Sequence, residues 1–545
     1  MDKICKKPLD AIIVGAGFSG IYQLYSLRDK LGLRAKILEA GGGIGGTWHW
    51  NRYPGARCDS ESHTYCYYFN RELLKTWQWT ERYPGQEEIL RYLNFCVETL
   101  NLQKDIYLNE RVSDAAWDDQ SQLWNVKTVS RNKFTARFLI TAVGCLSSAN
   151  EPKIDGLTAF SGDVYHTGHW PHEPVILNKK RVAVIGTGSS GIQAIPEIAN
   201  QAKKLFVLQR TPNYSVPARN QPLKQEFHFE FVKKIEFWRA KMMVSRHGHP
   251  WVAPNREVKK TAKEKRLKIM EKAWLHGGLS FRDSFSDVLV SAESNKIMSE
   301  FIHQKILKTV INPEIANILL PKDHPFGTKR PPIDTNYFET FNRENVCLLD
   351  LRANPITRCE ENGIRLKDDT LIKTDVIVFA TGFDAMTGSI EKLNLRGRNG
   401  LKLIDAWNAG PITYLGLTIP GFPNLFTITG PGSPSVLTNM PRSIEQHVDW
   451  ISNLIGHMIH AGHAEAEADD SAAKKWTKHV TDVANQTLLP KANHSWYLGA
   501  NIPGKPRVFM PYANGLNNYR KYCDEVTKKK YQGFVFKRPK KLTHH

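Results

Sequence analysis

Two glycine-rich segments of this chain have the residue types and the spacing that bind the phosphates of a dinucleotide. Both read Gly-x-Gly-x-x-Gly, at 15–20 and again at 186–191. Each follows a short apolar run typical of a strand and opens a stretch typical of a helix. In that setting glycines permit a tight turn and bring the pyrophosphate close to backbone N–H groups at a helix N-terminus. One such match is weak evidence, but two in matching settings predict two dinucleotide sites. The residues expected there are Gly15, Gly17, Ser19 and Gly20, and Gly186, Thr187, Gly188, Ser189, Ser190 and Gly191.

Residues of opposite charge follow the second strand-like run of each unit, at the same offset from its first glycine. In the first unit the residue is Glu39, and a carboxylate at that place accepts hydrogen bonds from free ribose hydroxyls. In the second it is Arg210, whose planar fork of donors suits a 2′-phosphate that a carboxylate would repel. Either residue taken alone could be an ordinary solvated loop charge. Together they predict FAD at the first site and NADP at the second, with NADPH as the reductant.

The segments between and after these units predict an α/β protein. With 545 residues the chain is too long for one compact core and suggests about two to four structural units. We expect two doubly wound Rossmann-like dinucleotide-binding domains, with a helical insertion in the second, because apolar residues between 217 and 324 follow helical spacing. The apolar run 374–379 ends at Ala380-Thr381-Gly382, much as an earlier run ends at Ala142-Val143-Gly144. The expected boundaries are 1–145 (FAD-binding domain, first part), 146–216 (NADP-binding domain, first part), 217–324 (helical insertion), 325–381 (NADP-binding domain, second part) and 382–545 (FAD-binding domain, second part, with substrate-side loops).

Composition narrows the function classes. No apolar stretch reaches the roughly 18 residues of a membrane span. The net charge of +20 is spread along the chain, so we read it as surface lysines and expect no nucleic-acid partner. The eight cysteines show neither a CxxC pair nor zinc-site spacing, which predicts reduced structural thiols, no metal site and no flavin disulfide reductase chemistry. We expect a cytoplasmic protein that is a monomer or a weak homo-oligomer.

The segment between the two glycine motifs carries a third pattern. Phe160, Gly162, His166, Trp170 and Pro171 fit the fingerprint FxGxxxHxxxW(P/D), and this arrangement resembles the Baeyer–Villiger monooxygenases. The resemblance extends over nearly the whole chain, through the segments 46–59, 329–331, 380–384 and 495–505. Within the family the segment 430–440 is most similar to the phenylacetone type, since cyclohexanone-type members are shorter there. Cys145 departs from that type, which has a polar amide after the closing glycine, so the substrate range is not carried over.

The resemblance implies roles for individual residues. Arg330 would sit over the flavin and stabilise a negatively charged C4a-peroxyflavin, and Asp59 would be its partner. Without the resemblance, Arg330 would be an exposed loop arginine and Asp59 a buried or turn-capping carboxylate. His166 would act through domain motion and not as an acid or base. Further implied residues are Lys329 with Arg210 and Thr211 at the 2′-phosphate, Trp496 on a mobile loop over the nicotinamide, Gly46, Thr47, Trp48 and Tyr65 at the cofactors, and Leu437 and Met440 on the substrate side.

The implied reaction uses NADPH, O2 and a small ketone. FAD takes hydride from NADPH, the reduced flavin combines with O2, and the C4a-peroxyflavin attacks the carbonyl; carbon then migrates to oxygen, giving an ester or lactone and water. An N- or S-oxygenating flavin monooxygenase shares both nucleotide motifs, but Trp170-Pro171 and the Asp59/Arg330 pairing argue against it. A basic binding protein on a disused nucleotide fold is the alternative from another class, and a purified protein without flavin would favour it.

We predict that NADPH is strongly preferred to NADH. Loss of a bidentate phosphate contact costs a few kcal/mol, on the order of a hundredfold in specificity. Arg210→Ala should therefore raise the apparent KM for NADPH and leave the KM for NADH little changed, as steady-state NAD(P)H oxidation would show. Equal use of both nucleotides by the unmodified protein would contradict the NADP assignment.

Overall fold

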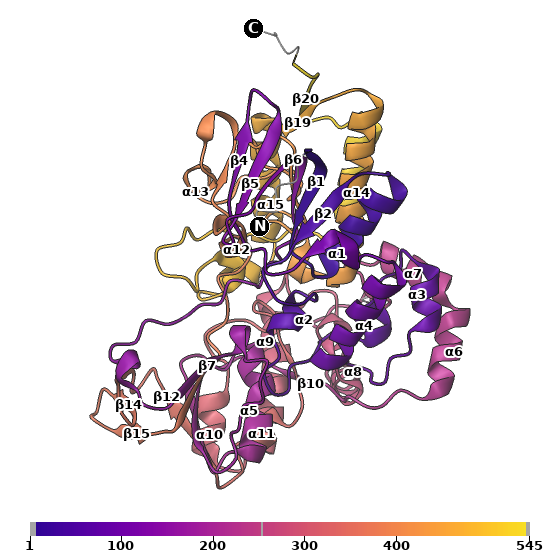
Figure 1. Cartoon of the computed structure of the whole chain (residues 1–545). Helices are drawn as coiled ribbons and strands as arrows, with labels where there is room; N and C mark the ends of the chain where they lie inside the picture. Colours follow the sequence, from indigo (N-terminus) through magenta and orange to yellow (C-terminus); the bar gives the residue numbers. More distant parts are fainter. Residues whose placement is uncertain (1–6, 252–253, 541–545) are drawn as a thin grey trace.

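The two glycine units form the centres of two separate sheets. The computed structural model describes residues 7–251 and 254–540, and within these the first sheet lies in the upper half of Figure 1 and the second in the lower half. Short α2 lies between them (Figure 1). The predicted fold class, two doubly wound units with a helical insertion, is confirmed.

The first sheet has eight strands in the described part of the chain, in the order β17-β4-β5-β6-β1-β2-β3, with β18 beside β6. Strands β6, β1, β2 and β3 are parallel neighbours, whereas β4, β5 and β6 form an antiparallel meander. The central β1 is almost entirely apolar and buried, as expected for a strand covered on both faces. The bounds are β1 Leu9–Val14, β2 Ala35–Leu38, β3 Ile106–Tyr107, β4 Val112–Asp118, β5 Leu123–Thr128, β6 Lys133–Thr141, β17 Leu395–Arg396 and β18 Leu425–Thr427.

The second sheet has five described strands, all parallel, in the order β12-β9-β8-β16-β7. Small two- and three-stranded sheets flank the two units. The bounds are β7 Asp163–His166, β8 Arg181–Ile185, β9 Lys204–Gln209, β10 Val216–Pro217, β11 Ile333–Asp334, β12 Val346–Asp350, β13 Ile356–Glu360, β14 Gly363–Leu366, β15 Leu371–Lys373, β16 Val376–Phe379, β19 Glu465–Ala468 and β20 Phe534–Lys537.

Each glycine turn leads directly into a helix. Helix α1, Phe18–Tyr25, starts after Gly17, and α5, Ser189–Gln201, starts after Gly188, so the second glycine of each motif is the N-cap. The described residues of 217–324, which leave out 252–253, contain no strand beyond Pro217 and form the helices α6 Gln225–Lys233, α7 Ile235–Val244, α8 Lys263–His276, α9 Ala292–Thr309 and α10 Pro313–Leu319. The other helices are α2 Thr47–Trp50, α3 Arg71–Thr76, α4 Gln86–Thr99, α11 Tyr337–Thr340, α12 Gly388–Glu391, α13 Leu403–Ala406, α14 Met440–His460, α15 Asp470–Asn485 and α16 Leu516–Lys528.

The fingerprint expected on a connecting linker is partly a strand. Residues Asp163–His166 form β7 and pair with β16, which makes them the edge of the second sheet. Gly162 is required there, because a Cβ would lie 2.3 Å from the Asp375 carbonyl oxygen. The buried Trp170 ring packs against Tyr165 at 5.3 Å. The fingerprint thus belongs to the second unit, and the exact domain boundaries stay a prediction.

The seven cysteines of the described residues are free, and Cys5 lies outside them. No described helix is long and apolar enough to cross a membrane. The described residues also contain no group of three or more His, Cys, Asp or Glu side chains placed to hold a metal ion.

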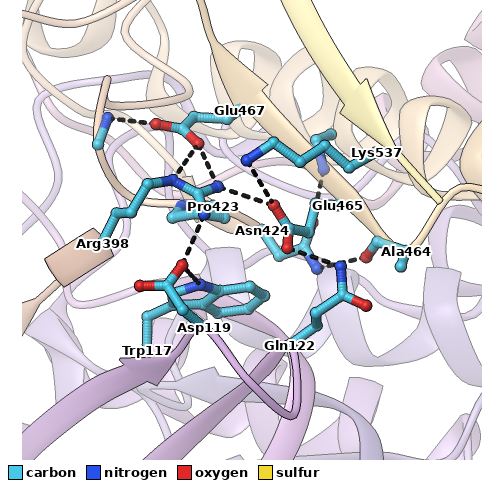
Figure 2. Close-up of polar contacts among 12 residues, drawn as sticks. Trp117, Asp119, Gln122, Arg398, Pro423, Asn424, Ala464, Glu465, Glu467 and Lys537 are labelled. Carbon is cyan, nitrogen blue, oxygen red and sulfur yellow. Dashed lines mark hydrogen bonds and ion pairs between the residues drawn. The ribbon is translucent and has the colours of Figure 1, made fainter. Parts of the chain in front are cut away.

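An ion network ties the C-terminal strands to the first sheet (Figure 2). Arg398 donates to Asp119 after β4, at 2.6 Å, and to Glu465 and Glu467 of β19, at 2.7 and 2.6 Å. Glu465 is only 1% exposed and accepts a further bond from Gln122 at 2.7 Å. A buried carboxylate without partners is costly, and Arg398 gives Glu465 its shorter ion pair, at 2.7 Å, whereas Lys537 lies 3.4 Å away.

We predict that Arg398→Leu destabilises the protein by about 2–3 kcal/mol, because the buried Glu465 keeps only Gln122 and the more distant Lys537, and Glu467 and Asp119 lose their ion pair as well. The matched control is Arg396→Leu, since Arg396 is half exposed and makes one ion pair at 3.7 Å with Asp114. That change should cost less than about 0.5 kcal/mol. Urea unfolding followed by circular dichroism measures both, and equal effects would argue against the network.

Candidate functional site

One cavity of about 1200 Å³ connects the two glycine turns, since Gly17 and Gly188 both line its wall. It also reaches segments far apart in the sequence, including 142–155 and 494–503. Most of the predicted site residues therefore come together. Those that line it are Gly17, Ser19, Gly46, Thr47, Trp48, Asp59, Tyr65, Gly186, Thr187, Gly188, Ser189, Ser190, Arg210, Thr211, Lys329, Arg330, Met440 and Trp496.

The first and third glycines of each motif lie against backbone atoms, whereas Gly188, the second glycine of the second motif, has free space around it. A Cβ on Gly15 would lie 2.6 Å from the Ala142 carbonyl oxygen, and one on Gly186 would lie 2.5 Å from that of Ala380. The third glycines, Gly20 and Gly191, lie against the carbonyl oxygen of the first glycine, at 1.8 and 2.2 Å from an added Cβ. A Cβ on Gly188, in contrast, would meet nothing within 4 Å and would occupy the cavity. This division fits a turn that a pyrophosphate approaches at its second glycine.

Glu39 does not line the cavity. Its side chain is buried, and its two oxygens accept the backbone N–H groups of Ala16 and Gly41, both at 2.7 Å. Burial raises the pKa of Glu39, although these two bonds oppose the shift. In this structure the carboxylate therefore fastens the glycine turn to the strand end, and its contact with a ribose stays a prediction.

Two cations, Lys329 and Arg210, line the cavity near each other. Burial, together with the nearby Arg210, lowers the pKa of Lys329, and Asp323 is 3.9 Å from its Nζ. Arg210 itself makes no hydrogen bond or ion pair with the other described residues. Two neighbouring positive charges with only one carboxylate nearby favour the binding of an anion such as a 2′-phosphate. The donors present therefore fit NADP(H).

Arg330 and Asp59 form a bidentate ion pair in the cavity wall. Nε and Nη2 of Arg330 donate to the two carboxylate oxygens, at 2.6 and 2.8 Å, and Nη1 donates to the Val436 carbonyl at 2.8 Å. About a quarter of each side chain remains exposed, at 24% and 22%. The guanidinium is thus fixed by three bonds while it still faces the cavity.

The pair stays ionised. Burial by itself would raise the pKa of Asp59, but the charge of Arg330 and the two hydrogen bonds outweigh it and lower that pKa. Burial would likewise lower the pKa of Arg330, and Asp59 more than reverses this. A permanent positive charge beside a cavity can stabilise an anion that forms there.

His166 bonds the edge strand to the closing loop of the second sheet. Its Nδ1 accepts the Gly168 N–H at 2.9 Å, so Nε2 carries the proton and donates to the Thr381 hydroxyl at 3.2 Å. Thr381 donates in turn to the Asn150 carbonyl at 2.6 Å. Burial lowers the pKa of His166, which keeps the ring neutral. His166 does not line the cavity, and its expected role through domain motion stays a prediction.

Trp496 and the loop around it contact a second predicted motif. Trp496 begins a short 3₁₀ turn, Trp496–Leu498, and Asn501 of the same loop donates to the Phe383 carbonyl at 2.8 Å. Lys505 pairs with Asp384 at 2.5 Å. The segments 380–384 and 495–505, both singled out in the sequence, are therefore bonded to each other. Leu437 does not line the cavity, and its substrate-side role stays a prediction.

Several wall residues were missed by sequence reasoning. The Oδ1 atoms of Asn213 and Asn501 are buried without a hydrogen-bond partner, and both residues line the cavity, so they could accept from a bound ligand. The carbonyl group of Val436 was also missed, because a backbone group leaves no signal in the residue type. Asn501 lies in a segment that the resemblance did point to, so position within that segment could have identified it.

Two phosphate turns, two cations for an anion and a charged pair in one cavity define an oxidoreductase that works with two dinucleotides. A profile of the family "Pyridine nucleotide-disulphide oxidoreductase" matches residues 12–266. The matched residues include both glycine turns.

Relatives over the full length identify the family. The chain is 40% identical to cyclohexanone 1,2-monooxygenase of Acinetobacter sp, covering 97% of each chain. It is 38% identical to a phenazine N-monooxygenase of Lysobacter antibioticus, again over 97% of each. Among solved structures, a steroid monooxygenase bound to NADP is 44% identical with a TM-score of 0.93, over 98% of this chain and 100% of that one. A complex of OTEMO with FAD and NADP is 37% identical with a TM-score of 0.94, over 97% and 100%. The chain is also 40% identical to a Baeyer–Villiger monooxygenase of Pseudooceanicola batsensis, over 96% of each, and it belongs to the Baeyer–Villiger monooxygenase family. The narrower likeness to the phenylacetone type stays a prediction.

We predict different failures for the two kinds of glycine in the second turn. Gly191→Ala places its Cβ against backbone, so it should lower the melting temperature of the protein even without nucleotide. Gly188→Ala has room and an ordinary φ of −81°, so the melting temperature should hold while the Kd for NADP+ rises about tenfold or more. Thermal unfolding and NADP+ titration separate the two effects. If Gly188→Ala binds NADP+ with an unchanged Kd, Gly188 does not contact the bound nucleotide.

Proposed function

We propose that this chain uses NADPH, FAD and O2 to insert one oxygen atom next to the carbonyl of a small ketone, giving an ester or lactone and water. The observation that carries the proposal is the Arg330–Asp59 pair in the wall of the cavity that joins both glycine turns. FAD bound at the first turn supplies the hydride acceptor and the reaction with O2.

The protein residues bind, orient and supply charge. Arg210 and Lys329 hold the 2′-phosphate of NADPH and so discriminate against NADH. Arg330 presents a positive charge to negative charge that develops in the cavity, and Asp59 with the Val436 carbonyl prevents the guanidinium from turning away. Such preorganised charge acts most strongly where water is excluded.

The wall near Arg330 favours an uncharged, mainly apolar ketone. Cys145, Leu146, Val436, Met440 and Trp496 line the cavity and pack in one apolar cluster. Burial raises the pKa of the Cys145 thiol, so it adds no negative charge. A carboxylate substrate would compete with Asp59 for Arg330. We therefore expect neutral ketones to be converted better than keto acids of similar size.

The cellular setting is part of the proposal. Free cysteines in the described part of the chain support a reducing compartment, and we propose the cytoplasm. We also propose a monomer or a weak homo-oligomer, and light scattering would measure this directly.

The function is tested by product analysis. The purified protein should be yellow, and a panel of linear, cyclic and aryl ketones with NADPH should yield esters or lactones by mass spectrometry. An aromatic amine and a thioether belong in the same panel, because N- and S-oxygenation use the same cofactors. Oxygenation of the amine or thioether with no ester from any ketone would replace the proposed reaction.

We predict that Arg330→Ala separates the two half-reactions. Loss of one such stabilising group costs about a hundredfold or more in rate, so ester formation should fall by at least that factor, with hydrogen peroxide released in its place. Flavin reduction by NADPH should continue near the normal rate, because hydride transfer precedes the need for the charge. Arg330→Lys should recover part of the ester yield, since an ammonium lacks the planar fork. Stopped-flow reduction and ester analysis measure the two steps.

Arg181→Ala is the matched control. Arg181 makes a similar bidentate pair with Asp375, at 3.1 and 2.6 Å, outside the cavity. Its loss should leave the ester yield per NADPH unchanged. If Arg330→Ala forms ester at the unmodified rate, the role given to Arg330 is wrong.

A further inference from the structure

The Val436 carbonyl, which accepts a hydrogen bond from Nη1 of Arg330, lies in a strained turn. Val436 is in the turn Ser435–Leu437, and Ser435 has a φ of +39°, which side-chain-bearing residues rarely adopt. Such a conformation persists only where neighbouring groups hold it. The Thr438 hydroxyl donates to the Ser435 carbonyl at 2.8 Å, which is one restraint from within the turn.

His247, from the helical insertion, restrains the same turn from outside. Its ring Nδ1 lies 3.1 Å from the Leu437 carbonyl, and its own carbonyl accepts the Asn439 N–H at 2.8 Å. The two bonds hold the residues directly after Val436. Asn439 in turn caps α14, with its side chain accepting the Arg442 N–H.

The far side of the His247 ring is also fixed. Nε2 lies 3.8 Å from Asp283, which accepts bonds from Arg282 and from the Trp251 indole N–H, both at 3.2 Å. Burial lowers the pKa of His247 to about 4, so the ring is neutral near pH 7. A ring nitrogen facing a carbonyl must carry the proton, so Nδ1–H is the donor to Leu437.

We propose that His247 is a positioning residue for Arg330: its bond to the Leu437 carbonyl holds the 435–437 turn so that the Val436 carbonyl stays in place to accept from the guanidinium. The inference rests on the proposed function, because Arg330 is the group whose position counts. No part of His247 lines the cavity, so it acts through the backbone of the turn and not on a substrate.

The test compares His247→Leu, which cannot donate, with His247→Asn, which can still offer an N–H. The control is His228→Leu. His228 lies on α6 of the same insertion, and its Nε2 is likewise near a backbone carbonyl, 3.0 Å from that of Lys75, a residue that makes no hydrogen bond or ion pair to the 435–437 turn or to Arg330. All proteins are assayed with FAD bound. One hydrogen bond is worth about 0.5–1.5 kcal/mol, which corresponds to about two- to tenfold.

In His247→Leu we expect the ester formed per NADPH consumed to fall about two- to tenfold, with hydrogen peroxide rising to match and flavin reduction unchanged. His247→Asn should recover part of the yield, and His228→Leu should show no change. Hydrogen exchange followed by mass spectrometry gives a second readout that needs no turnover: peptides covering 434–440 should exchange faster in His247→Leu only.

A normal ester yield and normal exchange in His247→Leu overturn the proposal. So does a lower melting temperature with unchanged ester yield per NADPH, which marks a purely structural role. If His247→Leu does not fold with FAD, His247→Asn decides: a partial or full ester yield with near-normal exchange over 434–440 supports the donor role, and complete loss of the ester yield overturns it. If the unmodified protein makes no ester, the proposed function fails, while the exchange comparison still reports whether His247 holds the turn.

Discussion

The ion pair between Arg330 and Asp59 is the interaction on which the rest of the site depends. Asp59 follows α2 of the first unit, Arg330 follows the helical insertion, and Val436 belongs to the returning chain. A charge in a cavity wall is tolerated only when its partners are already in place, and removal of one partner of a buried pair costs about 3–5 kcal/mol. The three segments must therefore meet accurately before the cavity can hold a stable cation. This requirement explains why the site forms between the two nucleotide units.

The first and third glycines pack in the same way in both units. In each, the first glycine lies against a carbonyl at the end of the closing strand, and the third lies against the first. Of the six glycines only Gly188 has free space for a Cβ, although Gly17 and Gly186 also line the cavity. The closing strands β6 and β16 then deliver the segments 142–144 and 380–382 to the cavity edge. The duplication thus places two phosphate turns on one cavity, with the charged pair in its wall.

Polar bonds hold the segment that follows β16, the closing strand of the second unit. His166 links the edge strand of the second sheet to Thr381, and Lys505 links the Trp496 loop to Asp384. Such bonds can be remade in another arrangement at modest cost, unlike a close-packed apolar interface. A two-step reaction that needs NADPH first and oxygen chemistry later is served by contacts of this kind.

The sequence by itself determined the fold class, the two glycine turns, the insertion and the place of Arg210 after the second turn. These follow from local patterns: glycine spacing, apolar periodicity and the charge at one offset from each turn. It also pointed to Arg330 and Asp59, through a resemblance and not through spacing, since they lie in different segments of the chain. Only the tertiary structure decided that Glu39 bonds the backbone of its own turn, that part of the 160–171 segment is an edge strand, and that Leu437 stays behind the wall. The same holds for the Val436 carbonyl and for His247. A hydrogen bond to a backbone carbonyl depends on which distant segments lie together in the fold. Because every residue has a carbonyl, the residue type does not indicate which one will accept the bond.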